Sequence, residues 1–207
     1  MPSSMVHLLV AHSLKDAFNI SDIGKFYLGC VAPDAVNLDG KASKEVRYKA
    51  HLRDTDYQKW INNVAVYKEE NRDFLSGCYD YFCGYLVHIL TDIAWDLTAQ
   101  PLLFKKMSDK GIADNELNTK KWNELSFYDS VSVKTDVWKN EIRPLLKDAK
   151  ADCSLTVSAD DADRCRDLIV SESFAASDNK SFGLVTDDMV TEAAKKVLEL
   201  SKKIKLL

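Results

Sequence analysis

The chain lacks two features that would assign it to a broad class at once. Its longest apolar stretch falls short of the roughly 20 residues that a membrane-spanning helix needs. Lysine and arginine are outnumbered by aspartate and glutamate, 28 to 32, and the formal net charge is -4. Proteins that bind duplex nucleic acid carry a basic surface, and this composition provides none. We therefore expect a soluble protein with no duplex nucleic acid as its partner.

Signals for secretion and for disulfides are also missing. The five cysteines are an odd number and none lies in a CxxC pair. This pattern indicates reduced thiols rather than a disulfide framework or a cysteine-rich metal site. The first residues contain neither the basic segment nor the apolar core of a signal peptide. A cytoplasmic location is the expectation.

The sequence contains no internal repeat and no low-complexity tract. Hydrophobic residues make up 46% and charged residues 29% of the 207 positions, which is ordinary for a globular protein with a real core. This length favours a single domain over residues 1–207, in which residues 1–110 carry the chemistry and residues 111–207 close the core.

Apolar residues recur at helical spacing along most of the chain, which predicts an all-α fold. The stretch 37–48 lacks this periodicity and is expected to be a loop. It is rich in basic residues, which could attract an anionic substrate or simply be solvated. A short strand at 131–133 is left open, since no alternating pattern continues from it. The expected helices span about 5–18, 21–32, 57–70, 73–100, 117–137, 138–149, 160–176 and 186–206.

One segment stands at the centre of this prediction. Nearly every residue from Tyr81 to Trp95 is apolar or aromatic, so a helix there must be buried on several sides. His88 and Asp92 interrupt it four residues apart, which stacks them on one helix face. A buried carboxylate needs a partner. The two side chains could hydrogen-bond each other, or they could share a metal ion.

Three further residues are candidate ligands: His7 on the first helix, Asp34 after Pro33, and His51 at the end of the basic stretch. His12 is five residues beyond His7, about 140° around the same helix, so both cannot face one site. Three imidazoles and two carboxylates form a mixed nitrogen and oxygen set that suits zinc or a similar divalent ion. A bridging carboxylate would allow two ions.

In this arrangement the sequence resembles the bacterial zinc-dependent phospholipase C family and, more remotely, the single-strand-specific zinc nucleases. The resemblance covers about the first half of the chain. It implies an all-α phosphoester hydrolase in which His51, His88 and Asp34 bind one zinc, Asp92 is shared between two, and His7 binds the second. The matching segments, in the family's order, are 1–7, 26–34, 49–51 and 84–92.

The sequence departs from this family in two respects. The secreted members begin with a tryptophan whose terminal amine binds metal, whereas this chain begins Met1-Pro2. They also hold a third zinc through histidines that follow the HxxxD motif, and no histidine follows His88 here. One or two ions are therefore expected. Asp96, Glu124 or Asp129 could add an oxygen ligand. We expect each of them instead to be a solvent-exposed acid on the face of a helix.

Together with this resemblance, the ligand set predicts a metal-dependent phosphoester hydrolase with zinc as the expected metal. The resemblance implies a phospholipid headgroup or another small phosphoester as the substrate. Asp34 is the candidate general base and also a ligand. The alternative is a non-catalytic helical protein that keeps the same ligands for stability or for binding a partner.

Overall fold

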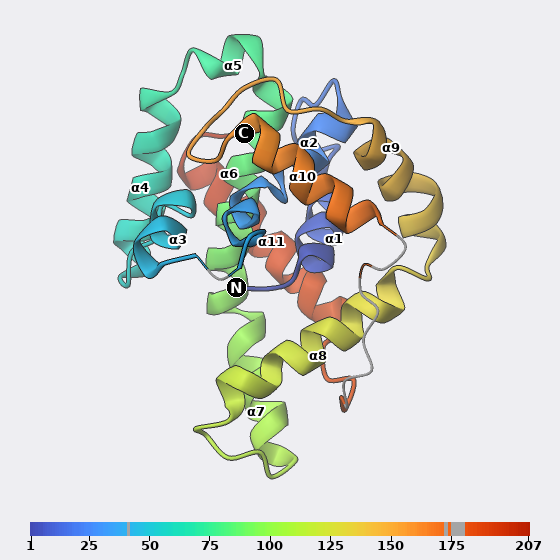
Figure 1. Ribbon diagram of the computed structural model, residues 1–207. Helices are drawn as coiled ribbons and strands as arrows, with labels where there is room; N and C mark the ends of the chain where they lie inside the picture. The colour runs from blue at the N-terminus through green and yellow to red at the C-terminus, as the bar shows by residue number, and fades with distance from the viewer. Residues whose placement is uncertain (41, 172–173, 175–180) are drawn as a thin grey trace.

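The computed structural model describes residues 1–40, 42–171, 174 and 181–207. Within these residues the chain is helical and contains no β-strand, which confirms the all-α prediction (Figure 1). None of the described helices is long and apolar enough to cross a membrane. In chain order the elements are α1 (Ser4–Leu14), α2 (Ile23–Gly29), the 3-10 helix η1 (Ala32–Asn37), α3 (Lys44–Ala50), α4 (Tyr57–Glu70), α5 (Phe74–Gly77), α6 (Tyr79–Leu97), α7 (Ala99–Asp109), α8 (Leu117–Ser132), the π-helix η2 (Val137–Ile142), α9 (Arg143–Asp148), α10 (Ala159–Val170) and α11 (Asp187–Lys203).

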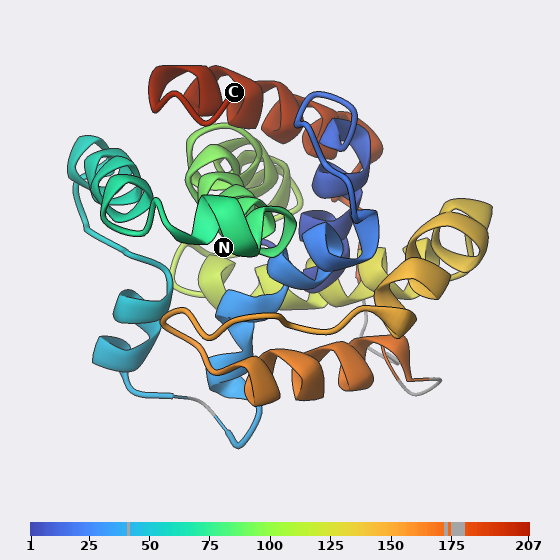
Figure 2. The ribbon, with the colours of Figure 1, turned by 90° about the horizontal axis from the view of Figure 1, so that it is seen from above.

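Helix α6 is the centre of the molecule. Every residue from Tyr81 to Asp96 is buried, as expected for a helix that is apolar on all sides. Seen nearly end-on in Figure 2, it is surrounded by α4, α11, α2 and the η1 segment. The later part of the chain also packs on this first half, since α11 contacts α6 and α1 while α10 contacts η1. One core therefore extends through the described chain.

Two glycines bring α2 and α6 into backbone contact. A Cβ atom added at Gly29 would lie 2.1 Å from the Tyr81 carbonyl oxygen, and one added at Gly84 would lie 2.1 Å from the Phe26 carbonyl oxygen. No other residue fits such a crossing without moving a helix. The close approach places the end of α2 one helical turn from His88, because Gly84 precedes that histidine by four residues.

The segment 37–48 is not the loop that the sequence predicts. It contains most of α3, whose first turn is capped by the Ser43 hydroxyl accepting a hydrogen bond from the Val46 amide. Helix α3 was missed because it buries only Ala50 and therefore has no apolar periodicity. The predicted helix 21–32 is also wrong at its end. It stops at Gly29, and Asp34 lies in the first turn of the separate helix η1.

Other boundaries differ from the predictions in smaller ways. The expected helix 73–100 is interrupted near Cys78 and Thr98, and Pro101 lies in the first turn of α7, where a missing amide costs little. Val131 belongs to α8 rather than to a strand. The expected helix 160–176 ends at Val170, and most of its remainder lies outside the described residues. The expected C-terminal helix is confirmed as α11, with acidic residues in its first turn and lysines in its last.

The glycine crossing generates a test. Replacing Gly84 with alanine forces a Cβ atom against the Phe26 carbonyl, so we expect a loss of roughly 1–3 kcal/mol in the free energy of unfolding, measured by denaturant titration. Gly77→Ala is the matched control, because an added Cβ there meets nothing within 4 Å and should change stability by less than about 0.5 kcal/mol. Equal effects of the two substitutions would contradict the crossing.

Candidate metal centre

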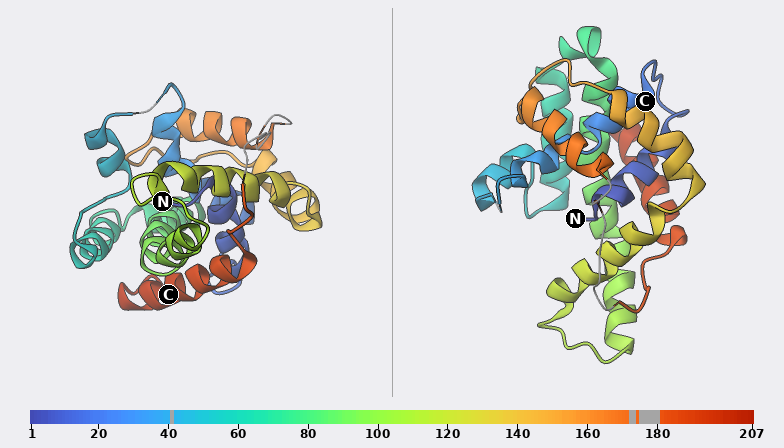
Figure 3. Two further views of the ribbon diagram at one scale, coloured as in Figure 1. Left: turned by 90° about the horizontal axis from the view of Figure 1, so that it is seen from below. Right: turned by 45° about the vertical axis from the view of Figure 1, so that its right-hand side comes forward.

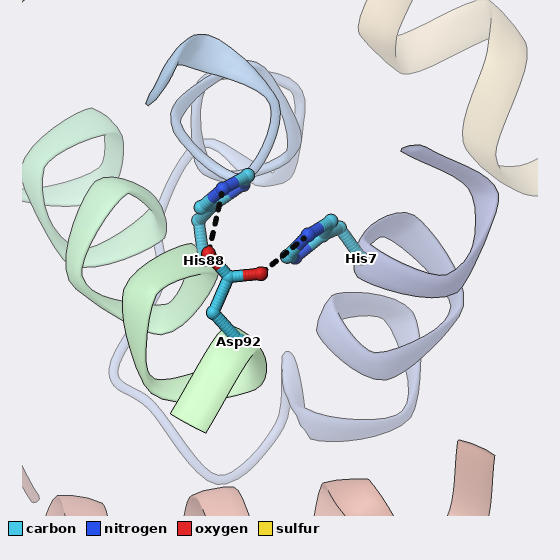
Figure 4. A group of neighbouring side chains, drawn as sticks. All are labelled: His7, His88 and Asp92. Carbon is cyan, nitrogen blue, oxygen red and sulfur yellow. Dashed lines mark ion pairs between the residues drawn. The ribbon is translucent and has the colours of Figure 1, made fainter. Parts of the chain in front are cut away.

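The five candidate ligands come together from four separate elements. His7 projects from α1, Asp34 from η1 and His51 from the C-terminal cap of α3, while His88 and Asp92 lie on α6. Figure 4 shows the His7 and His88 imidazoles directed at the Asp92 carboxylate. His88 and Asp92 are completely buried, and His7 and His51 are 1% exposed. The Asp34 side chain is the most accessible of the five, at 23%.

The distances within this cluster are those of groups that face one another without bonding directly. His7 Nε2 lies 3.5 Å from Asp92 Oδ1. The other Asp92 oxygen, Oδ2, is 3.8 Å from His51 Nε2 and 3.9 Å from His88 Nε2. Only the 3.2 Å separation of His51 Nε2 and Asp34 Oδ1 reaches hydrogen-bonding range.

These separations suit a shared cation. Nitrogen and oxygen ligands about 2.0–2.2 Å from a tetrahedral zinc ion lie about 3.3–3.6 Å from each other. The observed 3.2–3.9 Å distances bracket that range. Two ligand groups have atoms within 4.8 Å of one another: His7 with His88 and Asp92, and Asp34 with His51 and His88. The described residues can therefore bind a metal ion at this position.

Backbone carbonyls fix the orientation of two of the imidazoles. His51 Nδ1 lies 2.9 Å from the Arg47 carbonyl oxygen, and His88 Nδ1 lies 2.8 Å from the Cys30 carbonyl oxygen. A carbonyl only accepts, so in each ring Nδ1 carries the proton and donates it. In His88, Nε2 then presents a lone pair to Asp92. In His51, burial opposes protonation, but the hydrogen bond to Asp34 and the nearby Asp92 raise the pKa of the ring, which favours a second proton on Nε2 that is donated to Asp34 Oδ1. Donation from Nδ1 to a carbonyl is the outer-shell arrangement that orients histidine ligands in metal sites.

Several polar atoms at the centre of the cluster have no hydrogen-bond partner among the described residues. They are both ring nitrogens of His7, Nε2 of His88 and both carboxylate oxygens of Asp92. The His7 and His88 rings stack, with centroids 3.7 Å apart and planes 6° from parallel. Unsatisfied polar atoms in a core cost free energy, and such a concentration of them marks a functional site rather than a packing core.

Electrostatics points in the same direction. Burial and the adjacent His7 lower the pKa of His88 to about 3, so this imidazole is neutral near pH 7. Its Nε2, which faces Asp92, therefore carries no proton. Burial opposes ionisation of Asp92, but the three surrounding imidazoles outweigh it and hold its pKa below the usual value. The pKa of Asp34 is likewise lowered, by its hydrogen bond to His51 against the effect of burial. Two ionised carboxylates, beside the neutral His88 ring, provide the negative charge that a divalent cation neutralises.

The end of α3 is held in place by two aromatic side chains that sequence reasoning did not single out. Tyr85 of α6 donates its hydroxyl proton to the Ala50 carbonyl at 2.6 Å. Trp60 of α4 donates its ring N–H to the His51 carbonyl at 2.8 Å. Both partners are buried. These contacts, like the carbonyls that orient His51 and His88, depend on how distant segments pack, and no local sequence signal predicts them.

His12 lies outside the cluster, as its position on α1 predicts. Its Nδ1 is 2.8 Å from the Tyr27 hydroxyl, and its Nε2 is 3.5 Å from Glu141 Oε2. His12 is partly exposed, and its own partners satisfy it. It therefore serves as an internal control for the metal cluster.

The prediction of solvated helix-face acids is wrong, since all three residues concerned are buried. Glu124 accepts hydrogen bonds from the amides of Phe182 and Leu184, so it orders the segment before α11. Asp96 pairs with the Met1 amino group at 3.0 Å and with Arg53 at 3.3 Å. Asp129 accepts the Ser3 hydroxyl proton at 2.5 Å. None belongs to either ligand group.

A cleft of about 690 Å³ adjoins the cluster. It is lined by the N-terminal residues and by residues of η1, α3 and α8. Figure 3 shows these elements in two further views of the ribbon. Asp34 is the one member of the five-residue cluster that lines it. A molecule in this cleft therefore reaches the buried ligands from the Asp34 side.

No protein-family model, no curated protein and no solved structure matches this chain. The resemblance to the zinc-dependent phospholipase C family, and the roles that it implies, therefore stay predictions. The geometry of the cluster stands independently of them.

The cleft wall also contains an acid whose ionisation the fold opposes. Burial raises the pKa of Asp129 to about 7, although the hydrogen bond from the Ser3 hydroxyl acts to lower it. An unfolded aspartate titrates near 3.9. The folded carboxyl thus holds a proton between about pH 4 and 7 that the unfolded chain releases, and its contribution to stability is lost as the pH rises through that window.

Asp129→Asn removes this titration. We expect the variant to gain at least about 1 kcal/mol over the parent at pH 8 and nothing at pH 4, measured by denaturant titration with a chelator present. Asp16→Asn is the control, since its side chain is 92% exposed. An Asp129→Asn difference that is the same at both pH values would show that folding does not raise the pKa of this carboxyl.

Proposed function

We propose that this protein is a metal-dependent phosphoester hydrolase that binds zinc. The observation that carries the proposal is a set of buried polar atoms without hydrogen-bond partners at the core. Both oxygens of Asp92 face imidazoles, and His88 Nε2 presents a lone pair to Asp92 because Nδ1 of that ring donates to a carbonyl. Two acceptors facing each other in a dry core repel, and a cation between them removes the repulsion. Imidazole with carboxylate is a ligand set typical of zinc.

The geometry supports a particular division of the ligands. Asp92 Oδ2 faces His51 and His88, and Asp92 Oδ1 faces His7. His88 has only one free ring nitrogen, so it can serve one ion. We assign Asp34, His51, His88 and Asp92 to that ion. His7 and the other Asp92 oxygen would contribute to a second ion, which would need further ligands beyond these two.

A divalent cation held here would lower the pKa of water toward neutrality and would neutralise the charge that develops on a phosphoryl group. Asp34 is the candidate general base. It is the ligand that borders the cleft, and its lowered pKa keeps its carboxylate ionised and able to accept a proton from an incoming water. Asp92 has both oxygens directed at imidazoles, so it holds the site together instead.

The substrate class follows from the resemblance together with the cleft. A phospholipid headgroup or another small phosphoester is the class that the family resemblance implies. The volume of about 690 Å³ suits a small organic molecule. All five cysteines are free thiols, which is compatible with the reducing cytoplasm that we propose as its location.

Metal content tests the ligand assignment. Asp92→Asn keeps the shape of the side chain but removes the charge between the cations, so we expect elemental analysis of the purified variant to find little or no zinc. His51→Ala should lose zinc as well. Were Asp92 only a hydrogen-bonding partner of His88, Asp92→Asn would cost about 1–3 kcal/mol of stability and leave the metal content unchanged.

His12→Ala is the matched control for these variants. It removes a histidine from the same helix that carries His7, but its partners are Tyr27 and Glu141. Zinc content should remain at the parent level. Loss of zinc in His12→Ala, or full zinc content in Asp92→Asn, would overturn the assignment.

Hydrolysis tests the reaction class. Zinc-replete protein should cleave a chromogenic phosphoester in a chelator-sensitive way. Asp34→Ala should lower the rate by at least about 100-fold, because it removes both a zinc ligand and the candidate general base. Asp39→Asn is the control, since this exposed neighbour pairs with Arg164 on the surface. A zinc-replete parent that is inert toward a broad panel of phosphomonoesters and phosphodiesters would rule out the hydrolase.

A second candidate is a non-catalytic protein in which the ion acts as a structural link. It is favoured by the origin of the ligands, since the ion assigned to Asp34, His51, His88 and Asp92 would tie η1, α3 and α6 together, and a second ion at His7 would add α1. An ion that binds only the folded state stabilises it by mass action. Under this candidate a chelator lowers the melting temperature, and no phosphoester is hydrolysed.

A further inference from the structure

The cleft beside Asp34 has two chemically different walls. One wall carries Asp34 and Arg47, from η1 and α3, together with the Asn37 amide. The other carries Trp122 and Leu125, from α8. The first presents charge and hydrogen-bond donors, and the second presents an aromatic ring and an aliphatic side chain. A ligand that fits both walls has an anionic end and an apolar end.

Arg47 is the cation of α3 that lines this cleft. Its Nε donates to the Ala42 carbonyl at 3.2 Å, and its guanidinium makes no ion pair with any residue in the described ranges. Other cations nearby are engaged elsewhere: Lys44 lies over the Tyr48 ring, and Arg53 pairs with Asp96. A guanidinium with free N–H groups in a fixed fork matches the oxygens of a phosphoryl group.

Trp122 supplies the apolar wall. It is 46% exposed, although tryptophan buries more surface than any other side chain when it packs in a core. Trp60, Trp95 and Trp138 are by contrast all buried, with exposures of 0–4%. An exposed indole on the wall of a cleft gives a flat apolar group a surface on which to stack.

We propose that this cleft binds an organic phosphate, with its anionic head at Arg47 beside Asp34 and a flat apolar group against Trp122. This proposal rests on the proposed function, since it places the phosphoryl group at the entrance to the metal centre. It goes further in naming the two residues that select the ligand. Arg47 recognises the anionic phosphoryl group, and Trp122 recognises the organic group that is esterified to it.

Calorimetric titration of the purified protein with phenylphosphonate and methylphosphonate tests both roles, because neither compound can be hydrolysed as an ester. The parent should bind phenylphosphonate more tightly than methylphosphonate. Arg47→Gln should weaken both at least about tenfold, the loss expected for a charged hydrogen bond. Trp122→Ala should weaken phenylphosphonate roughly two- to tenfold and leave methylphosphonate unchanged, so that the preference disappears.

Matched controls separate these effects from general damage. Lys49→Gln removes one positive charge from the same helix at an exposed position, and Phe127→Ala removes an exposed aromatic ring from α8 outside this cleft. Both should bind the two phosphonates as the parent does. Melting temperature and zinc content are measured for every variant, so that a lost fold or a lost ion is not mistaken for a lost anion contact.

Three results would overturn the cleft assignment: no phosphonate binding by the parent, parent-like binding by Arg47→Gln, or an unchanged phenyl preference in Trp122→Ala. Failure of the hydrolase would look different. A protein that binds both phosphonates in the Arg47- and Trp122-dependent manner but cleaves no phosphoester keeps this ligand site and loses the catalytic proposal.

Discussion

The structure depends on one buried carboxylate. Asp92 lies in the C-terminal half of α6 with 0% exposure, and its neighbours hold it ionised. No hydrogen-bond donor among the described residues satisfies either of its oxygens. Leaving such a charge uncompensated costs several kcal/mol, so the surrounding chain must supply a counter-charge. Three imidazoles gather around it, but His88 donates its proton to a backbone carbonyl, and Nε2 of His51 lies closer to Asp34, at 3.2 Å, than to Asp92, at 3.8 Å.

The fold can be understood as the support for that arrangement. The glycine contact between α2 and α6 brings the Cys30 carbonyl onto His88 Nδ1. Helix α3 turns its Arg47 carbonyl onto His51 Nδ1, and Tyr85 anchors the end of that helix to α6. A ring oriented in this way loses little freedom when it binds an ion. Packing and site chemistry therefore constrain the same few backbone positions.

Much of this was predictable from the sequence, because the strongest signals are local. The unbroken apolar run predicts the buried helix α6, and the i, i+4 spacing of His88 and Asp92 places both on one face. The cluster of five candidate ligands was also predicted, and the structure brings all five together. His12 falls outside, as the 140° offset from His7 requires.

Other features were beyond sequence reasoning for physical reasons. Helix α3 buries a single residue, so periodicity does not reveal it, and Arg47 was read as part of a basic loop. The sequence predicts Asp129 and Glu124 to be surface acids, because their burial depends on distant segments, namely Ser3 and the residues before α11. The cleft between α3 and α8 joins residues about 75 positions apart. Such pairings arise only when the whole chain packs.

The central claim is that a cation separates the imidazole nitrogens from the carboxylate oxygens at the core. Anomalous diffraction at the zinc edge, from crystals of zinc-replete protein, tests it most directly. We predict a peak about 2.0–2.2 Å from the Nε2 atoms of His51 and His88 and from oxygens of Asp34 and Asp92. A cluster without any peak, in which the imidazole N–H groups bond directly to Asp92 at about 2.8 Å, would contradict the account.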